Sequence, residues 1–262
     1  WFRHVWEYVF PLYPALIVMS GMLGIPLSRL SLAQAPLTVG AIVGGVLMGL
    51  RGIGRPSNPA AEGRAQRWHS LRTLALSIWP IVLVIVLSLA LELELALSLT
   101  IAIVLAAIVH RMPLRLLGQV LRRSLSPHTA LLVVSIMIFK QLVLASGAAD
   151  ELSAAFISWG IAPLLITVAV PLMLGLLTGL TMSMVGIGYP LLLPFITGSE
   201  VHLNTAVLAF GAGFIGILLS PLHLCLALTR DYFQADWVPL YRRLLPAAAF
   251  VGLAAAVAWL LA

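Results

Sequence analysis

The chain has 262 residues, of which 61% are hydrophobic and only 9% are charged, and its formal net charge is +6. A soluble domain of this length carries about a quarter of its residues as charges, so the composition excludes a water-exposed globular protein and indicates a surface that mostly faces lipid. The single cysteine, Cys225, excludes a disulfide within one chain and a multi-cysteine metal site. The basic excess is typical of cationic loops on one side of a membrane, and it does not indicate nucleic-acid binding.

A series of apolar segments follows one another along the chain. About 20 helical residues cross the hydrocarbon core of a bilayer, and most of these segments approach that length. They lack the alternation of a transmembrane barrel, so the expected fold is an all-α polytopic membrane protein. The segments run over 5–25, 32–50, 73–91, 95–109, 129–146, 161–178, 181–197, 203–228 and 245–262.

Most of the Lys and Arg residues lie in three linkers, 51–72, 110–127 and 229–243. Because basic loops stay on the cytoplasmic side, all three are expected in the cytoplasm of a prokaryotic cell whose inner membrane the chain crosses several times. The acidic connections 147–160 and 198–202 are then expected outside. Linker 110–127 alternates apolar and basic residues, so it is either a helix in the membrane interface or an ordinary basic loop.

Segments 161–178 and 181–197 are interpreted as the arms of a re-entrant hairpin, although charge alone would equally allow two full spans. The connection 178–183 has no charged or aromatic residue, unlike a loop at the membrane surface. Its candidate ligand groups are Thr178, Thr181 and Ser183. Small residues and hydroxyls suit a tip at membrane depth that binds a ligand, and the alternative is a close contact between helices.

A second polar cluster lies near the beginning of the chain. Arg3, His4 and Glu7 are followed by prolines that favour a broken helix. Arg3 and Glu7 are four residues apart and would pair on a helix, whereas the alternative is a surface turn. Farther along, Lys140 is interpreted either as a partner for an anion or as a side chain that reaches the membrane surface.

A third cluster surrounds a Ser-Pro pair within 203–228. Pro221 removes a backbone donor and leaves a carbonyl of the preceding turn without its helical partner. Ser220 and His223 flank this break, and Asn204 lies earlier in the same segment. His223 is therefore predicted to belong to a binding site, with a purely structural histidine as the alternative.

Residues 1–14 and 219–233 resemble the signature stretches of the domain-of-unknown-function 401 integral membrane proteins, and the second stretch is the more specific. That family is similar to the ion transporter superfamily, which includes gluconate permeases and dicarboxylate/sodium symporters. The resemblance implies two inverted repeats, each with a re-entrant hairpin and a broken helix. It also implies a further segment before Trp1 with the first hairpin, so a truncated N-terminus is expected.

The same resemblance implies a division of the chain. The expected parts are the end of repeat one at 1–50, a cytoplasmic linker at 51–72, and repeat two at 73–262 with its hairpin at 161–197, its broken helix at 203–228 and its last helix at 245–262.

The sequence contains no HExxH, no G-x-S-x-G and no P-loop motif, so no catalytic residue is assigned and an enzyme is not expected. The expected function is a secondary transporter for a small organic anion, coupled to H⁺ or Na⁺. Arg3 or the amides of the hairpin tip would hold the carboxylate. Glu7, His4 or His223 would carry a coupling proton, since both residue types can titrate near neutral pH when buried.

A Na⁺-coupled mechanism would instead use hydroxyls of Thr181, Ser183 and Ser220. No cofactor, no other metal and no nucleic acid is expected to bind. The expected partners besides the anion and the coupling ion are the lipid bilayer and a second copy of the chain. Two rival functions remain, an intramembrane enzyme that uses Ser220, His223 or Cys225, and a membrane scaffold that transports nothing.

Overall fold

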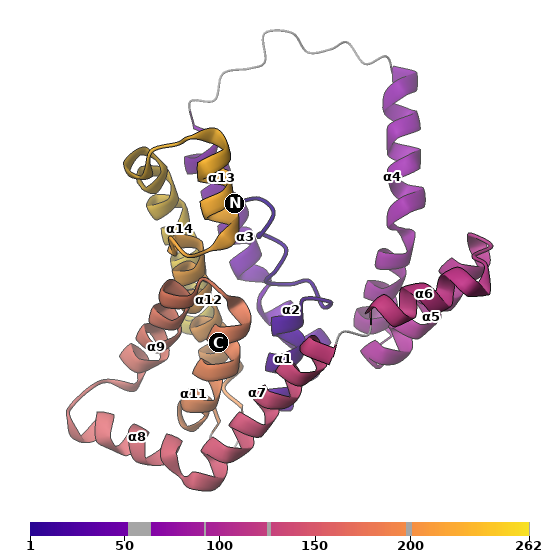
Figure 1. Ribbon diagram of the computed structural model, residues 1–262. Coiled ribbons are helices and arrows are strands. Elements are labelled where there is room, and N and C mark those ends of the chain that lie inside the picture. Colours follow the sequence, from indigo (N-terminus) through magenta and orange to yellow (C-terminus); the bar gives the residue numbers. More distant parts are fainter. Residues whose placement is uncertain (52–63, 92, 125–126, 198–200, 262) are drawn as a thin grey trace. The chain divides into compact units, whose positions relative to one another are not determined.

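The computed structural model describes residues 1–51, 64–91, 93–124, 127–197 and 201–261 (Figure 1). These residues are helical with connecting turns, and their only β-pairing is an isolated bridge between Thr197 and Val201. The expected all-α class is confirmed for this part of the chain. The chain divides into two compact units, one formed by Trp1–Arg51 and Leu131–Ala262, the other by Gly52–Ala130.

The smaller unit contains two apolar helices and one basic helix. Helix α4 (Arg64–Ile85) continues as a π-helical turn, η2 (Val86–Ala90), and packs against α5 (Leu95–Val109). Helix α6 (Leu114–Ser124) occupies the basic linker. The helical interpretation of that linker is therefore confirmed, and its location in a membrane interface stays a prediction.

The larger unit begins with turns rather than with a helix. Residues 2–9 form successive turns, and α1 (Pro14–Leu23) begins at Pro14. Proline is favoured in the first turn of a helix. A helix rarely extends to the residues before a proline, because proline has no N–H to donate and it disfavours the helical conformation of the preceding residue. The chain then forms α2 (Leu27–Ala33), α3 (Ala35–Gly44) and the π-helical η1 (Gly45–Gly49).

A bent pair of helices follows, which belongs to the larger unit from Leu131 onward. Helix α7 (Pro127–Ser146) and α8 (Ala148–Ser158) meet at Gly147, which has a φ of 69°, and their axes differ by 62°. The expected connection 147–160 is therefore wrong as a loop, since most of it is helical. The acidic residues of this stretch made it resemble a loop, although its apolar residues have the spacing of an amphipathic helix.

The predicted hairpin consists of two helical arms. Helix α9 (Pro163–Thr178) ends at Gly179, and the second arm is built from α10 (Thr181–Ser183), η3 (Met184–Gly188) and α11 (Tyr189–Ile196). Gly179 has a φ of 64°, a left-handed conformation that ends helices and favours glycine. The turn therefore falls at the small-residue stretch that was predicted as the tip.

The last part of the unit contains the broken helix. Helix α12 (Leu203–Leu219) ends at the Ser-Pro pair, α13 (Leu224–Phe233) follows the break, and α14 (Trp237–Leu260) completes the chain. The basic linker 229–243 is thus mostly helical, and only 234–236 connects α13 to α14. Its basic side chains interrupt the apolar pattern, so hydropathy alone does not indicate where the helices begin and end.

Glycines allow α9 and α12 to approach closely. A Cβ atom on Gly175 would overlap the carbonyl of Gly213, and one on Gly216 would overlap the carbonyl of Leu172. Small residues at helix contacts are typical of membrane proteins, where dispersion contacts hold helices together. This contact sets the position of the hairpin against the broken helix.

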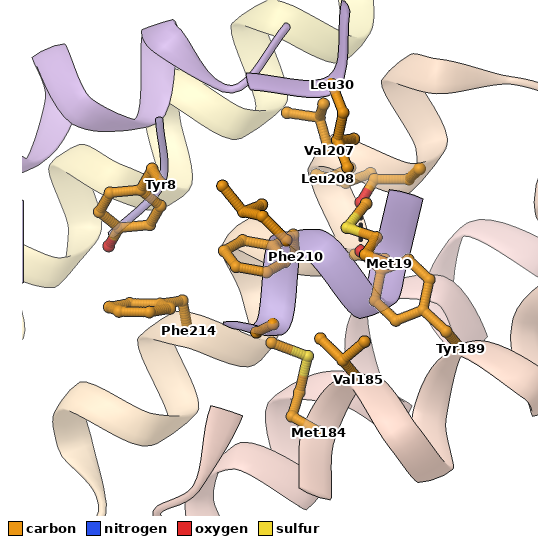
Figure 2. Packing of buried hydrophobic residues seen from close by; sticks show 14 of the residues in the cluster. Tyr8, Met19, Leu30, Met184, Val185, Tyr189, Val207, Leu208, Phe210 and Phe214 are labelled. Carbon is orange, nitrogen blue, oxygen red and sulfur yellow. Dashed lines mark hydrogen bonds between the residues drawn. The ribbon is translucent and has the colours of Figure 1, made fainter. Parts of the chain in front are cut away.

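The N-terminal turns pack onto α12 through aromatic side chains. Tyr8 is fully buried, and its ring centroid lies 4.5 Å from that of Phe214 and 6.3 Å from that of Phe210 (Figure 2). Met19 of α1 and Met184 of η3 belong to the same core cluster. The core therefore brings together the first turns, the hairpin and α12.

Three helical stretches in the described part of the chain are long and apolar enough to cross a membrane: Leu27–Gly49, Leu203–Phe233 and Trp237–Leu260. The bent pair of α7 and α8 adds a fourth if it counts as one span. These lengths support the expected membrane protein. The division into inverted repeats stays a prediction.

Candidate functional site

The hairpin tip and the helix break meet at backbone level. The Nδ1 atom of His223 donates to the carbonyl of Gly179 at 3.0 Å, and a Cβ atom on Gly179 would lie 2.7 Å from the backbone nitrogen of His223. Only glycine allows this approach together with the positive φ. The tip of the hairpin and the helix break are therefore in direct contact.

Ser220 ties the break to the first arm of the hairpin. Its side chain has no solvent exposure, donates to the carbonyl of Leu176 at 2.7 Å and accepts from the backbone N–H of Leu222 at 3.2 Å. The Leu219 carbonyl next to the break accepts from the hydroxyl of Tyr241 at 2.7 Å. Polar backbone groups inside a protein require such partners, and here the protein supplies them.

The first turns add His4 and Glu7 to the same place. The Nδ1 atom of His4 lies 2.8 Å from Glu7 Oε1, and its Nε2 atom lies 3.3 Å from Nε2 of His223. The expected pair of Arg3 and Glu7 is wrong, because this segment forms turns with bonds between residues three apart, not a helix. Such turns bring Glu7 to His4, and the guanidinium of Arg3 instead donates to Sγ of Cys225 at 3.3 Å.

The hydrogen bonds of the two histidines determine what their facing nitrogens can do. A carbonyl only accepts, so Nδ1 of His223 carries its proton, and an ionised Glu7 likewise holds the proton of His4 on Nδ1. Neutral imidazole has one N–H, so the two Nε2 atoms then present lone pairs to each other. The pair can hold a shared proton or a cation between these atoms.

A cavity of about 550 Å³ lies next to this cluster, within the larger unit. Its polar side chains are cationic, neutral or titratable, and no carboxylate lines it. Arg243 approaches from α14, and its guanidinium is held by the carbonyls of Gly49 and Arg51 at 3.4 and 2.8 Å. The lining includes Arg3, His4, His223, Cys225, Thr229 and Arg243. A cavity with this lining favours an anion.

The hydroxyl residues of the tip have separate places. Thr181 Oγ1 lies 2.6 Å from the hydroxyl of Tyr13, and this bond joins the tip to the end of the first turns. Thr178 donates to the carbonyl of Leu174 in its own helix at 2.7 Å. Ser183 is half-buried in α10, and no polar contact among the described residues connects it to the histidines.

Two other candidates lie away from the cluster. Asn204 is at the beginning of α12, about 24 Å along the helix from Ser220 at 1.5 Å per residue. Lys140 donates from Nζ to the carbonyl of Met22 at 2.7 Å, where it caps the end of α1. Neither side chain lines the cavity.

The sequence did not predict three residues of the site, which are Arg243, Tyr241 and Tyr13. Arg243 stands in a stretch that reads as a basic loop, and its place depends on the packing of α14 against α3. The tyrosines bond to groups far away in the chain, so no local spacing indicates them. Cys225 lies two residues after His223, and this proximity was a signal for a shared site.

A comparison with curated proteins finds no match. A family model described as "Protein of unknown function (DUF401)" matches residues 1–262. This match covers both stretches on which the resemblance rested, and it extends over every residue of the site. The chain therefore belongs to the DUF401 family.

Proposed function

We propose that the protein is a secondary transporter for a small organic anion in the inner membrane of a prokaryotic cell. The observation that carries the proposal is the cavity at the helix break, lined by two arginines and two histidines but by no carboxylate. Broken helices that meet a hairpin tip at membrane depth are typical of substrate and ion sites in secondary transporters. We include the inverted repeats of the ion transporter superfamily in this proposal.

The size and lining of the cavity suit a small carboxylate. Ligand sites have volumes of about 300–1,000 Å³, and this cavity of about 550 Å³ lies within that range. Arg3 is the expected anion ligand, because its described partner is the thiol of Cys225 and not an acidic group. Leu218, Leu224 and other apolar lining residues would contact the carbon skeleton.

The length of α9 supports the re-entrant interpretation. Its 16 residues extend about 24 Å, which is less than the hydrocarbon thickness of about 30 Å. An arm of this length that turns at Gly179 and contacts the break supports a tip inside the membrane rather than at its far surface.

For the coupling ion we favour H⁺ over Na⁺. Of the hydroxyls expected to bind Na⁺, that of Ser220 is buried and both donates to Leu176 and accepts from Leu222, and that of Thr181 is bonded to Tyr13. None of the expected Na⁺ ligands lines the cavity. The connected side chains of Glu7, His4 and His223 form a row of proton acceptors beside the cavity. An enzyme that uses Ser220 is less well supported, since this hydroxyl is buried and donates to Leu176.

Anion binding by Arg3 can be tested on the natural protein that contains this chain. Thermal stabilisation would be measured with a panel of sugar acids and dicarboxylates, and the affinity of any stabilising anion by calorimetry. Arg3→Gln keeps a polar side chain but shortens it and removes its charge, and with it a charged hydrogen bond worth about 1.5–3 kcal/mol. We expect affinity to fall about 10–100-fold.

Arg29→Gln is the matched control, because Arg29 is exposed on α2 and does not line the cavity. This variant should bind the anion with unchanged affinity. Equal affinity of wild type and Arg3→Gln, or equal losses in both variants, would contradict the assignment of Arg3.

A further inference from the structure

We propose that His4, His223 and Cys225 form a binding site for a transition-metal ion of the Zn²⁺ type. One ligand atom from each of these three side chains lies within 4.8 Å of the other two. The residues come from the first turns and from the helix break, which the core holds together. This inference goes beyond the proposed transport function and rests on the geometry of the three ligands.

The spacing of the two imidazoles matches a shared tetrahedral ion. Nitrogen ligands lie about 2.0–2.1 Å from Zn²⁺, so two of them at a tetrahedral angle are about 3.3–3.4 Å apart. The observed separation of the two Nε2 atoms is 3.3 Å. The ion therefore fits between His4 and His223 with their rings where they are.

The hydrogen bonds made by Nδ1 of each histidine are typical of histidines that bind a metal through Nε2. Histidines that bind a metal through one nitrogen usually donate from the other to a carboxylate or a backbone carbonyl, which fixes the tautomer and the ring. Here Nδ1 of His4 contacts the carboxylate of Glu7, and Nδ1 of His223 contacts the carbonyl of Gly179. These hydrogen bonds leave the Nε2 lone pair of each histidine free to bind a metal.

Cys225 supplies the third ligand and determines the class of metal. Thiolate and imidazole together select Zn²⁺ and similar soft or borderline ions over Mg²⁺, Ca²⁺ and Na⁺. The guanidinium of Arg3 donates to Sγ at 3.3 Å, a hydrogen bond that a metal-bound sulfur can also accept. A tetrahedral arrangement places Sγ about 3.6 Å from each nitrogen. The ligand atoms lie within 4.8 Å of one another, so the distances from Sγ to the two nitrogens need to shorten by up to about 1.2 Å.

Three protein ligands leave the fourth position of a tetrahedral ion open. All three residues line the cavity of about 550 Å³, so that position faces the space assigned to the anion. A water molecule or a carboxylate oxygen of a bound anion can complete the coordination. The metal and the anion would then share one site.

The test uses the natural protein, purified without a polyhistidine tag, stripped with a chelator and free of added anions. Zn²⁺ is titrated by calorimetry, and Co²⁺ is added in parallel because thiolate coordination gives it a charge-transfer absorption band. We expect one site per chain and the thiolate band. Cys225→Ser should abolish that band.

The variants separate ligands from supporting groups. His223→Gln and Cys225→Ser each remove a metal ligand. They should weaken Zn²⁺ binding by more than the roughly 10–100-fold expected when a ligand loses only its supporting hydrogen bond. Glu7→Gln should weaken it by about 10–100-fold and keep the Co²⁺–thiolate band, as expected for a positioning residue. His202→Gln should change nothing, since His202 is exposed at the start of α12, outside the cluster.

Folded wild-type protein that binds no Zn²⁺ would overturn the proposal. Binding of equal strength in wild type, Cys225→Ser and His223→Gln would also overturn it, because the ion would then occupy an adventitious surface site. Both results are obtained without substrate, so they leave the predicted anion binding by Arg3 to be judged separately.

Discussion

At the scale of single residues, the contacts that hold the site together are bonds between distant parts of the chain. The hydroxyls of Tyr13 and Thr181 are 2.6 Å apart and connect the end of the first turns to the hairpin tip. Next to the cavity, the first turns make comparable side-chain contacts through His4 with His223 and through Arg3 with Cys225. These bonds were beyond sequence reasoning, because they follow from packing and not from spacing.

The Tyr13–Thr181 bond is expected to stabilise the fold by about 0.5–1.5 kcal/mol. Tyr13→Phe and Thr181→Val each remove one hydroxyl and keep the shape of the side chain. Each variant should lower the free energy of unfolding by about that amount, measured by denaturation in detergent. The double variant should lose less than the sum of the two, because both substitutions remove the same bond. Fully additive losses would show that the two hydroxyls do not interact.

At the scale of elements, hydropathy and proline positions predicted the helices well, whereas helix ends within charged stretches were missed. The break at Ser220–Pro221, the turn at Gly179 and the late start of α1 at Pro14 all follow from residues with special backbone properties. The helices over 148–158 and 224–233 were not predicted at their full extent. Their charged residues resemble loop residues when only composition is considered.

The contact between α9 and α12 makes a prediction at this scale. Gly175→Ala introduces a methyl group against the Gly213 carbonyl, which should destabilise the protein by about 1–3 kcal/mol or more, as overpacking does. The control is Gly21→Ala in α1, where nothing lies within 4 Å of the added atom. That change should be neutral or stabilising by at most about 1 kcal/mol, since alanine favours helices. Equal melting temperatures for the two variants would refute the close contact.

At the scale of the whole molecule, linker 229–243 lies beside the residue at which linker 51–72 begins. Arg243 of linker 229–243 bonds to the carbonyls of Gly49 and Arg51, where linker 51–72 begins. This agrees with the charge argument, which assigns both linkers to the cytoplasm. The cavity lies beside Arg243, so we expect it to open toward that side.

The expected sides can be measured with single cysteines in a Cys225→Ser background. Trp159→Cys, at an exposed position after α8, should react with a membrane-impermeant thiol reagent added to intact cells. Arg242→Cys, at an exposed position of α14, should react only after the cells are permeabilised. Labelling of Arg242→Cys in intact cells would reverse the proposed orientation.

The candidate site was only partly predictable from the sequence. The sequence indicated four of its residues, because polar side chains within apolar segments are costly unless they are paired or functional. These four are His223, His4, Glu7 and Arg3. The sequence did not indicate their partners, since the pairing of His4 with His223 joins residues at opposite ends of the chain. The expected pair of Arg3 and Glu7 depended on a helix, whereas the segment forms turns, the alternative that the sequence had left open.

The central claim is that the natural protein moves small organic anions across a membrane. Its most direct test is counterflow in proteoliposomes that are loaded with one unlabelled sugar acid or dicarboxylate at a time, with the labelled anion outside. We predict saturable accumulation of at least one anion, absent from protein-free liposomes and strongly reduced in Arg3→Gln but not in Arg29→Gln. Absence of counterflow for the whole panel with folded, reconstituted protein would contradict the account.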